Sequence, residues 1–379
     1  GVSLAFGLKP VNRLVTMTAK LDRPGRAIDV RMLSATWMED LSSRGGKIVI
    51  EPVTPARLDD IAAAHDLTAV AAGRGDLCNL FARNAERSVY DKPQRKLTLI
   101  ITRGAPMQID RVPFLPVRFN LTAGVGEAFW VPYLHKSGEH TWNLLFEAKP
   151  AGPMDRFDEC KTGDECVAMA KKVIAELAPW DSAFAEPMTL ADERGWLKGG
   201  VAPTVRAPVA KLPSGRAVTA IGDTIISLDP IAGQGANCGT RQARNFVACV
   251  DAHQDGPLDE AWMTSTFEQF WREQGQHIVR FNNLLLEPIS GAGRLLLVSQ
   301  YGSDGVHDNV QQRIANRFAN NFDDTSRYTE ALVRDAASKQ LIAESGGSFP
   351  WSFARGLAGV ARGQVRQTLG MQPRHPAHW

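Results

Sequence analysis

The segment from residue 220 to residue 237, AIGDTIISLDPIAGQGAN, constrains the fold more than any other part of this 379-residue chain. The apolar run at 217–221 predicts a strand buried in a parallel sheet. Gly222 and Asp223 follow at the carboxyl end of that strand, where ligands bind in open α/β sheets. A proline and two more glycines come next, and Asn237 opens a predicted helix. The segment therefore predicts a strand, a glycine-rich turn and a helix, with one carboxylate at the turn.

A turn of this kind suits a flat cofactor, because Pro230, Gly233 and Gly235 let the backbone approach a ring closely. The free N–H groups and positive dipole end of the helix would face the pyrimidine edge of a flavin, where reduction places negative charge. An ordinary strand-to-helix turn also favours glycine, aspartate and asparagine, so a purely structural turn stays open. The predicted cofactor contacts of the segment are Gly222, Asp223, Pro230, Gly233, Gln234, Gly235, Ala236 and Asn237.

The segment resembles the second flavin fingerprint of the FAD-dependent aromatic hydroxylase superfamily, in which Gly-Asp precedes Pro and Gly-Gln-Gly-x-Asn. Four further stretches resemble landmarks of the oxygenase component of styrene monooxygenase and of its indole-oxidising relatives. They are RAIDVRML at 26–33, RGGK at 44–47, DKPQR at 91–95 and LKGGVAP at 197–203. The resemblance extends over most of the chain up to about residue 250.

The fold that this resemblance implies is α/β, with an aromatic-hydroxylase-like FAD-binding domain whose Rossmann-type sheet is incomplete. A mainly antiparallel β substrate domain is inserted, and a helical C-terminal region follows. We expect the FAD-binding domain at 1–95 and 196–250, the β domain at 96–195 and the helical region at 251–379. The Gly- and Arg-rich tail from residue 355 is predicted to be mobile.

The resemblance also implies a monooxygenase component that epoxidises small styrene- or indole-like alkenes with dioxygen. FAD, delivered as FADH2 by a separate NADH-dependent flavin reductase, would carry the reactive oxygen as a C4a-hydroperoxide, so no catalytic side chain is expected. Arg26 would reach the phosphate or ribityl oxygens, and Gly73 would offer a backbone contact. Leu228, Pro230 and Ile231 would form walls between flavin and substrate.

Flavoproteins of this type begin with a βαβ unit whose Gly-x-Gly-x-x-Gly motif cradles the pyrophosphate, and residues 1–26 contain no such motif. We therefore expect the chain to be N-terminally incomplete and to bind FAD weakly by itself. Two alternatives stay open: a single-component aromatic hydroxylase that uses NAD(P)H, and a catalytically silent truncated flavoprotein. A flavin halogenase is disfavoured because the sequence lacks Trp-x-Trp-x-Ile.

Composition excludes several other classes. A net charge of +2 argues against a nucleic-acid partner. The absence of a long apolar run or a signal-peptide pattern predicts a cytoplasmic protein without a membrane partner, and a homodimer stays open. Five unevenly spaced cysteines argue against a disulfide framework, and Cys160 and Cys166 are predicted to be a reduced pair rather than a zinc site.

Residue periodicity predicts the remaining elements. Helices are predicted over 30–43, 58–65 and 166–177 and in most of the chain after residue 258. Strands are predicted over 47–51, 67–73, 97–102, 117–121, 128–134 and 141–147. Apolar side chains of the last two strands are candidates for a substrate pocket, although strand aromatics are mostly core residues. They are Phe129, Trp130, Tyr133, Trp142, Leu144 and Phe146.

Overall fold

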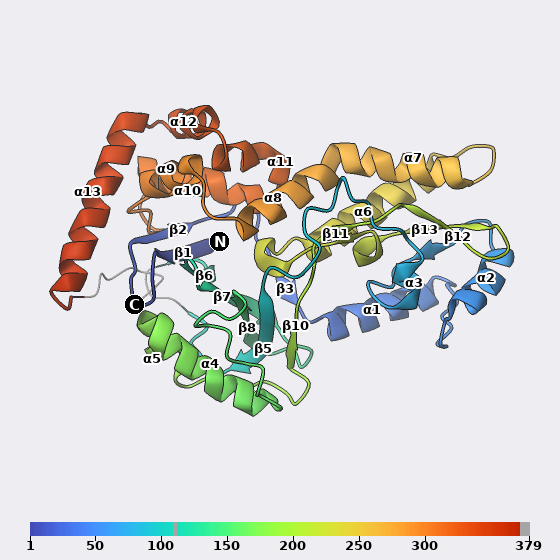
Figure 1. The fold of residues 1–379 in the computed structure, drawn as a ribbon, viewed down its shortest axis with the longest axis horizontal. Coiled ribbons are helices and arrows are strands. Elements are labelled where there is room, and N and C mark those ends of the chain that lie inside the picture. The colour runs from blue at the N-terminus through green and yellow to red at the C-terminus, as the bar shows by residue number, and fades with distance from the viewer. Residues whose placement is uncertain (109–111, 372–379) are drawn as a thin grey trace. The chain divides into compact units, whose positions relative to one another are not determined.

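The computed structural model describes residues 1–108 and 112–371. The chain divides into two compact units, each assembled from segments far apart in the sequence (Figure 1). The first unit consists of Gly1–Ile48, Arg95–Gly199 and Pro288–Trp379, and the second consists of Val49–Gln94 and Gly200–Glu287.

A nine-stranded sheet forms the framework of the first unit within the described residues. Its main path runs in the order β10 (Trp196–Gly199), β5 (Lys96–Arg103), β8 (His140–Ala148), β7 (Gly126–Leu134), β6 (Val117–Thr122), β1 (Val2–Gly7) and β2 (Val15–Ala19). Off this path, β3 (Ala27–Ile28) pairs with β7, and β9 (Thr189–Leu190) pairs with β5. Neighbours are antiparallel except β1 with β6 and β3 with β7. The four strands predicted between residues 97 and 147, and their antiparallel pairing, are confirmed.

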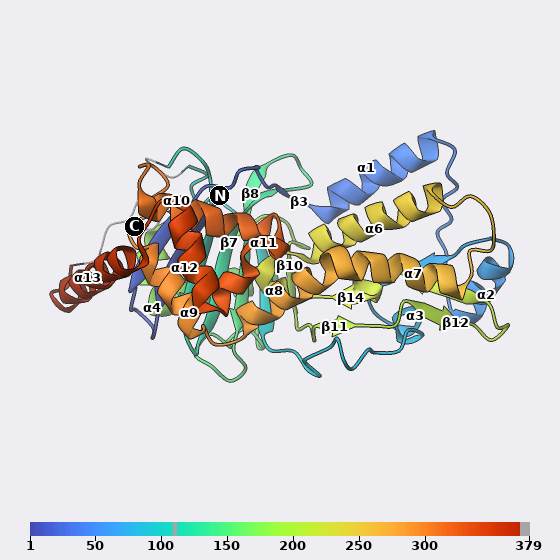
Figure 2. The same cartoon turned by 90° about the horizontal axis from the view of Figure 1, so that it is seen from above.

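Helices cover both faces of this sheet, above and below it in Figure 1, and Figure 2 looks down on one of these two layers. On one face lies α4 (Gly163–Leu177), which packs its apolar side against β5, β7 and β8, with α5 (Ser182–Ala185) following it. On the other face, α9 (Gly291–Ser299) and α10 (Val310–Ala319) pack against β1 and β2. The predicted helix at 166–177 begins three residues earlier, because Thr162 and Glu165 form a capping box.

The aromatic side chains predicted to line a pocket lie mostly in the core of the first unit. Trp130 and Trp142 are fully buried and meet Phe184 edge to face, with ring centroids 4.9 and 5.4 Å away. Leu144 and Phe146 belong to the same cluster. Phe129 is buried on the opposite face against Phe119. These five are therefore core residues, and only Tyr133 is half-buried; burial raises the pKa of its phenol to about 12.

The C-terminal region is helical, as predicted, and most of the segment predicted to be a mobile tail belongs to its last helix. Helices α11 (Thr325–Tyr328) and α12 (Asp335–Glu344) precede α13 (Phe349–Thr368), which contains most of the predicted tail. Gly356 of this helix packs closely on Val298 of α9, and Gly359 packs on Tyr301, which follows α9. The last part of the predicted tail, 372–379, lies outside the described residues.

The second unit contains two small sheets and helices around one apolar core. One sheet has the order β12 (Val209–Lys211), β13 (Ala217–Ala220) and β4 (Ala69–Val70), and the other pairs β11 (Thr204–Val205) with β14 (Ile226–Ser227). Its helices are α2 (Pro55–Ala63), α3 (Asp76–Asn79), α6 (Gly235–Asp251), α7 (Glu260–Phe270) and α8 (Gln276–Leu286). A π-helical turn, Trp271–Gly275, joins α7 to α8.

Three predicted elements between residues 47 and 73 differ from the structure. The segment 47–51 is not a strand, because it pairs with no described strand, and Ile50 is 90% exposed. The strand predicted at 67–73 is reduced to the two residues of β4. The helix predicted at 58–65 begins at Pro55, because Thr54 caps it and proline favours the first helical position.

Helix α1 (Val30–Ser43) of the first unit has the predicted bounds, but its apolar stripe is exposed. Asp29 caps the helix and is itself nearly fully buried. Arg31 joins Asp29 to Asp192, with N–O distances of 2.6 and 3.0 Å. His135 Nε2 lies 2.7 Å from Asp192 Oδ2, so the network ties α1 to the β7–β8 hairpin and to the segment after β9.

Within the described residues, every helix is too short or too polar to cross a lipid bilayer.

Replacing Gly356 with alanine should destabilise the first unit. The new Cβ would lie 2.0 Å from the Val298 carbonyl oxygen of α9, and neither backbone yields easily. Overpacking of this kind costs about 1–3 kcal/mol, which outweighs the gain of about 1 kcal/mol in helix propensity. Gly363→Ala is the matched control, because its Cβ would lie 3.7 Å from the Tyr301 hydroxyl, an ordinary contact. Urea unfolding that finds both variants equally stable would contradict the packing.

Acid should weaken the network around Arg31. Hydrogen bonds from Arg31 lower the pKa of Asp29 to about 2 and hold the pKa of Asp192 well below its ordinary value. Because both pKa values are depressed by folding, this stabilisation is present above pH about 4 and is lost as the pH falls toward 2. Asp192→Asn should therefore reduce the pH dependence of the unfolding free energy between pH 6 and 3 by about 1–2 kcal/mol. Asp40→Asn, on the exposed side of α1, is the control and should leave the pH dependence of the unfolding free energy unchanged.

Candidate functional site

The predicted strand, turn and helix lie together in the second unit. Strand β13 ends at Ala220 and is followed by two short 3₁₀ turns, Gly222–Thr224 and Pro230–Ala232. Helix α6 begins at Gly235, two residues before the predicted start at Asn237. Asn237 therefore lies in the first turn, where its side-chain amide donates to the Gly233 carbonyl at 3.5 Å.

Gly73 lies beside Asp223, although 150 residues separate them in the sequence. Strand β4 pairs in parallel with β13, so the carboxyl ends of both strands meet at one edge of the small sheet. The Gly73 N–H donates to the Thr224 hydroxyl at 3.1 Å, and a Cβ on Gly73 would lie 3.6 Å from the Asp223 Cβ. The fold thus brings Gly73, which was predicted to contact the cofactor through its backbone, next to the fingerprint segment.

Open space lies over the glycines of the turn. Gly222 and Gly233 have φ values of 61° and 60°, a left-handed conformation that favours glycine. A Cβ added to Gly222, Gly233 or Gly235 would meet no other atom within 4 Å. The side of each glycine on which a Cβ would lie is therefore open, and a flat ligand can approach from that side.

Within the described residues, no side chain caps the N-terminus of α6. Gln234 is the residue that caps the helix, but its side chain makes no capping bond. Instead its amide donates to the Ala232 carbonyl at 3.2 Å, and the residue is buried. Gln234 can thus reach a ligand through its backbone rather than its side chain. Such a helix end is a site for negative charge.

Electrostatics single out Asp223 in this turn. The side chain reaches solvent, but the surrounding loops remove part of its water, and this burial raises the pKa of its carboxyl group. Hydroxyl donors from a ligand would restore the lost hydrogen bonds. Burial, and then the nearby charge of Asp223, raise the pKa of Cys238 to about 12. This thiol stays protonated at neutral pH and is no nucleophile.

Three residues that support the turn were not predicted as site residues. The Thr224 hydroxyl accepts a hydrogen bond from the Gly73 N–H. Arg206 Nη1 donates a hydrogen bond to the Thr224 carbonyl at 3.2 Å. Gln242, buried on α6, accepts from the Gly222 N–H at 2.5 Å. The signal for Gln242 was its spacing of four residues from buried Cys238, which places both on the inner face of α6.

The other predicted site residues have mixed positions. Arg26 belongs to the first unit and is exposed, so its predicted contact with FAD stays a prediction. Leu228 packs in the core of the second unit, and Ile231 is 4% exposed. Pro230 is half-buried. Of the three predicted substrate walls, Pro230 has the most side-chain surface open to a ligand.

The five cysteines are free thiols. Cys160 and Cys166 are both buried in the first unit. Burial and the neighbouring Cys160 raise the pKa of Cys166 to about 11, so this thiol is protonated and unreactive.

Comparison with known proteins identifies relatives for part of the chain. Residues 73–183 match the family described as the styrene monooxygenase A putative substrate binding domain. Styrene monooxygenase StyA from Pseudomonas fluorescens is 29% identical over 229 residues, which cover 59% of this chain and 54% of that protein. StyA from a Pseudomonas species matches to the same extent. The chain thus spans about half the length of these relatives.

Solved structures with a similar fold include two halogenases. The flavin-dependent halogenase CmlS has a TM-score of 0.53 and 13% identity, over 97% of this chain and 65% of CmlS. Halogenase PltM has a TM-score of 0.54 and 12% identity, over 100% of this chain and 76% of PltM. At such identities the likeness shows the fold alone, and it confirms the predicted aromatic-hydroxylase-like α/β class. The chain is thus similar in sequence to styrene monooxygenase StyA over part of its length, and similar in fold to flavin-dependent halogenases.

Proposed function

We propose that this chain is the oxygenase component of a flavin-dependent monooxygenase that epoxidises small vinyl aromatics such as styrene or indole. One oxygen atom of dioxygen enters the alkene, the other leaves as water, and NADH supplies the two electrons. The observation that carries the proposal is the open glycine turn beside Asp223 at the ends of two parallel strands. The match of residues 73–183 to a styrene monooxygenase domain supports the substrate class.

The residues of the turn fit the ribityl and ring portions of FAD. Asp223 would accept hydrogen bonds from ribityl hydroxyls, and the open Cβ side of Gly222, Gly233 and Gly235 would let the ring approach. The N-terminus of α6 stabilises negative charge on the pyrimidine edge. Gln242 and Thr224 hold Gly222 and Gly73 in place. These residues bind and orient the cofactor and take no part in covalent chemistry.

Reduced flavin supplies the oxygen-transferring chemistry when it is bound. The task left to the chain is to position the alkene and exclude water, because water diverts reduced flavin and dioxygen toward hydrogen peroxide. Pro230 serves this task as a rigid, apolar wall. Since no protein nucleophile is needed, the protonated thiol of Cys238 is compatible with the mechanism.

Reduced FAD is supplied by a separate NADH-dependent flavin reductase in this proposal. The chain itself would then oxidise no NADH. Steady NADH oxidation by the purified chain with FAD would instead indicate a single-component hydroxylase.

Replacing Asp223 with alanine should weaken binding of riboflavin, which carries the ribityl chain but no phosphate. Loss of hydrogen bonds to a carboxylate costs about 1.5–3 kcal/mol, so the dissociation constant should rise at least about tenfold. Lumiflavin lacks the ribityl hydroxyls, and its affinity should not change. Flavin fluorescence titration of the full chain measures both.

Asp251→Ala is the matched control, because Asp251 is an exposed carboxylate at the far end of α6. It should leave riboflavin affinity unchanged. If Asp223→Ala weakens the binding of lumiflavin as much as that of riboflavin, the carboxylate does not contact the ribityl chain, and its assignment fails.

The chain, mixed anaerobically with FADH2 and styrene and then with oxygenated buffer, should form styrene oxide without NADH. Pro230→Ala should lower the ratio of epoxide to hydrogen peroxide several-fold, because removing the wall admits water. Pro213→Ala, in the exposed turn between β12 and β13, should leave the ratio unchanged. Gas chromatography and a peroxidase assay give the two yields. Peroxide alone, at FADH2 concentrations that saturate the site, would overturn the proposed activity.

A further inference from the structure

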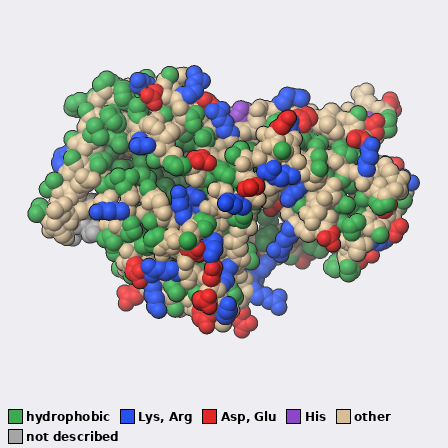
Figure 3. All heavy atoms as spheres, viewed as in Figure 1, with side chains coloured by type: hydrophobic (Ala, Val, Ile, Leu, Met, Phe, Trp, Pro, Cys, Tyr) green, Lys and Arg blue, Asp and Glu red, His purple; other side chains and the backbone are tan. Residues whose placement is uncertain are grey.

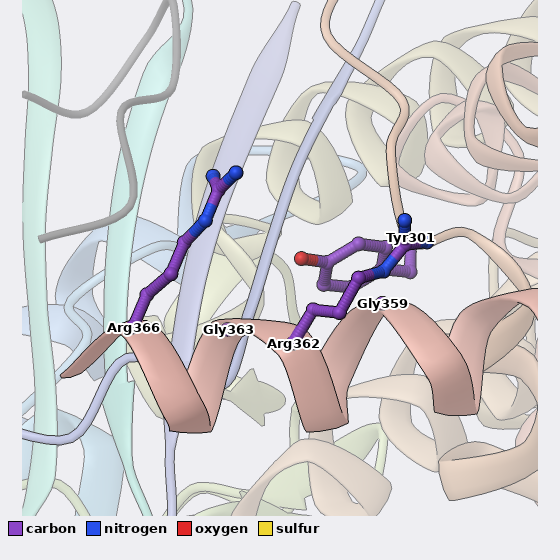
Figure 4. A pocket seen from close by; sticks show the side chains of 5 residues that line it. All are labelled: Tyr301, Gly359, Arg362, Gly363 and Arg366. Atoms are coloured by element: carbon purple, nitrogen blue, oxygen red, sulfur yellow. The ribbon is translucent and has the colours of Figure 1, made fainter. Parts of the chain in front are cut away.

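A small cationic cavity lies on α13 in the first unit, unconnected with the proposed flavin site. Its volume is about 130 Å³, and its walls come from one helix and one tyrosine. The lining residues are Tyr301, Gly359, Arg362, Gly363 and Arg366 (Figure 4). Both arginine side chains extend from the side of α13 on which Tyr301 lies.

Two glycines of α13 create this cavity. A Cβ on Gly359 would lie 2.2 Å from the Tyr301 ring, so only glycine lets the ring lie directly against the helix. One turn later, a Cβ on Gly363 would lie 3.7 Å from the Tyr301 hydroxyl. The ring is therefore held so that its hydroxyl points along the helix between the two arginines, and no side chain at position 363 fills the space.

The two arginines are not used by the fold. Within residues 1–108 and 112–371, neither Arg362 nor Arg366 forms an ion pair. Arg362 Nε makes one long contact with the Ala358 carbonyl, 3.3 Å away on the same helix. By contrast, Arg313 and Arg317 of nearby α10 pair with carboxylates.

The charge of α13 favours an anion. The helix contains three arginines and no acidic residue from Phe349 to Thr368. Basic side chains lie along this helix on the face shown in Figure 3, among hydrophobic and uncharged groups. The third arginine, Arg355, does not line the cavity. Two exposed guanidinium groups one turn apart and a phenol hydroxyl between them thus present hydrogen-bond donors, with no carboxylate among the lining residues.

We propose that this cavity binds a phosphate group, as inorganic phosphate or as the terminal group of a phosphate monoester. Guanidinium groups match tetrahedral oxyanions with paired hydrogen bonds, and a dianion balances two cations. The volume is below the roughly 300–1,000 Å³ of pockets that enclose drug-sized ligands, so one anionic group enters and any attached group stays outside. A carboxylate, with one charge and two oxygens, leaves part of this donor set unused.

The test titrates the full chain with inorganic phosphate at low ionic strength and a pH at which phosphate is dianionic, by calorimetry. One saturable site per chain is expected, with acetate much weaker. Arg362→Ala and Arg366→Ala should each weaken binding at least about tenfold, the loss typical of a hydrogen bond to a charged group. Tyr301→Phe keeps the packing ring and should weaken binding by a smaller factor. Phenyl phosphate in place of inorganic phosphate shows whether a monoester is accepted.

Arg355→Ala is the matched control, since it removes the same charge from the same helix without touching the cavity. Its phosphate affinity should stay within about twofold of the unmodified chain. Equal losses in all three arginine variants would show a diffuse charge effect and overturn the site, as would the absence of saturable binding. Arg366→Lys keeps the charge and helix propensity, so its weakened binding separates loss of the guanidinium from any misfolding of Arg366→Ala. Flavin is absent throughout, so the outcome is independent of the proposed oxygenase activity.

Discussion

The hydrogen bond from the Gly222 N–H to Gln242 Oε1, 2.5 Å long, fixes the geometry on which the candidate flavin site depends. It ties the end of β13 to the inner face of α6 while Gly222 adopts a left-handed conformation. The Thr224 hydroxyl accepts a hydrogen bond from the Gly73 N–H, which holds the loop after β4 at the same edge of the sheet. Because side chains that point inward do the holding, the outer backbone of the turn stays uncovered. A site for a flat cofactor is thus built from backbone, with Asp223 as its one charged contact.

The first unit is stabilised by packing rather than by hydrogen bonds at a turn. Its antiparallel strands bury a layer of aromatic side chains under α4, and its C-terminal helices approach one another through glycines. The close contact of α13 with α9 turns a sequence rich in glycine and arginine into a 20-residue helix. Two further glycines of this helix, Gly359 and Gly363, leave a cationic cavity beside Tyr301. Packing and the proposed phosphate site therefore have one structural origin.

Local patterns predicted much of this architecture. The alternation of apolar residues gave the four strands between residues 97 and 147 within two residues at each end, and helix α1 was predicted with its observed bounds. Predictions failed where structure depends on a partner. Residues 47–51 have strand composition, but no strand of the described chain lies beside them to pair with. The strand aromatics gave no sign of which face of the sheet α4 would cover.

The sequence by itself determined the strand, turn and helix of the fingerprint, because glycine, proline and aspartate act through local backbone preferences that need no distant contact. The fold class was predicted from the resemblance of its landmarks to those of styrene monooxygenases. Only the tertiary structure decided that Gly73 meets Asp223, that Gln242 and Thr224 hold the turn, and that Leu228 and Ile231 are buried. These outcomes depend on strand pairing and helix packing between distant segments. Local residue preferences do not specify which of those segments meet.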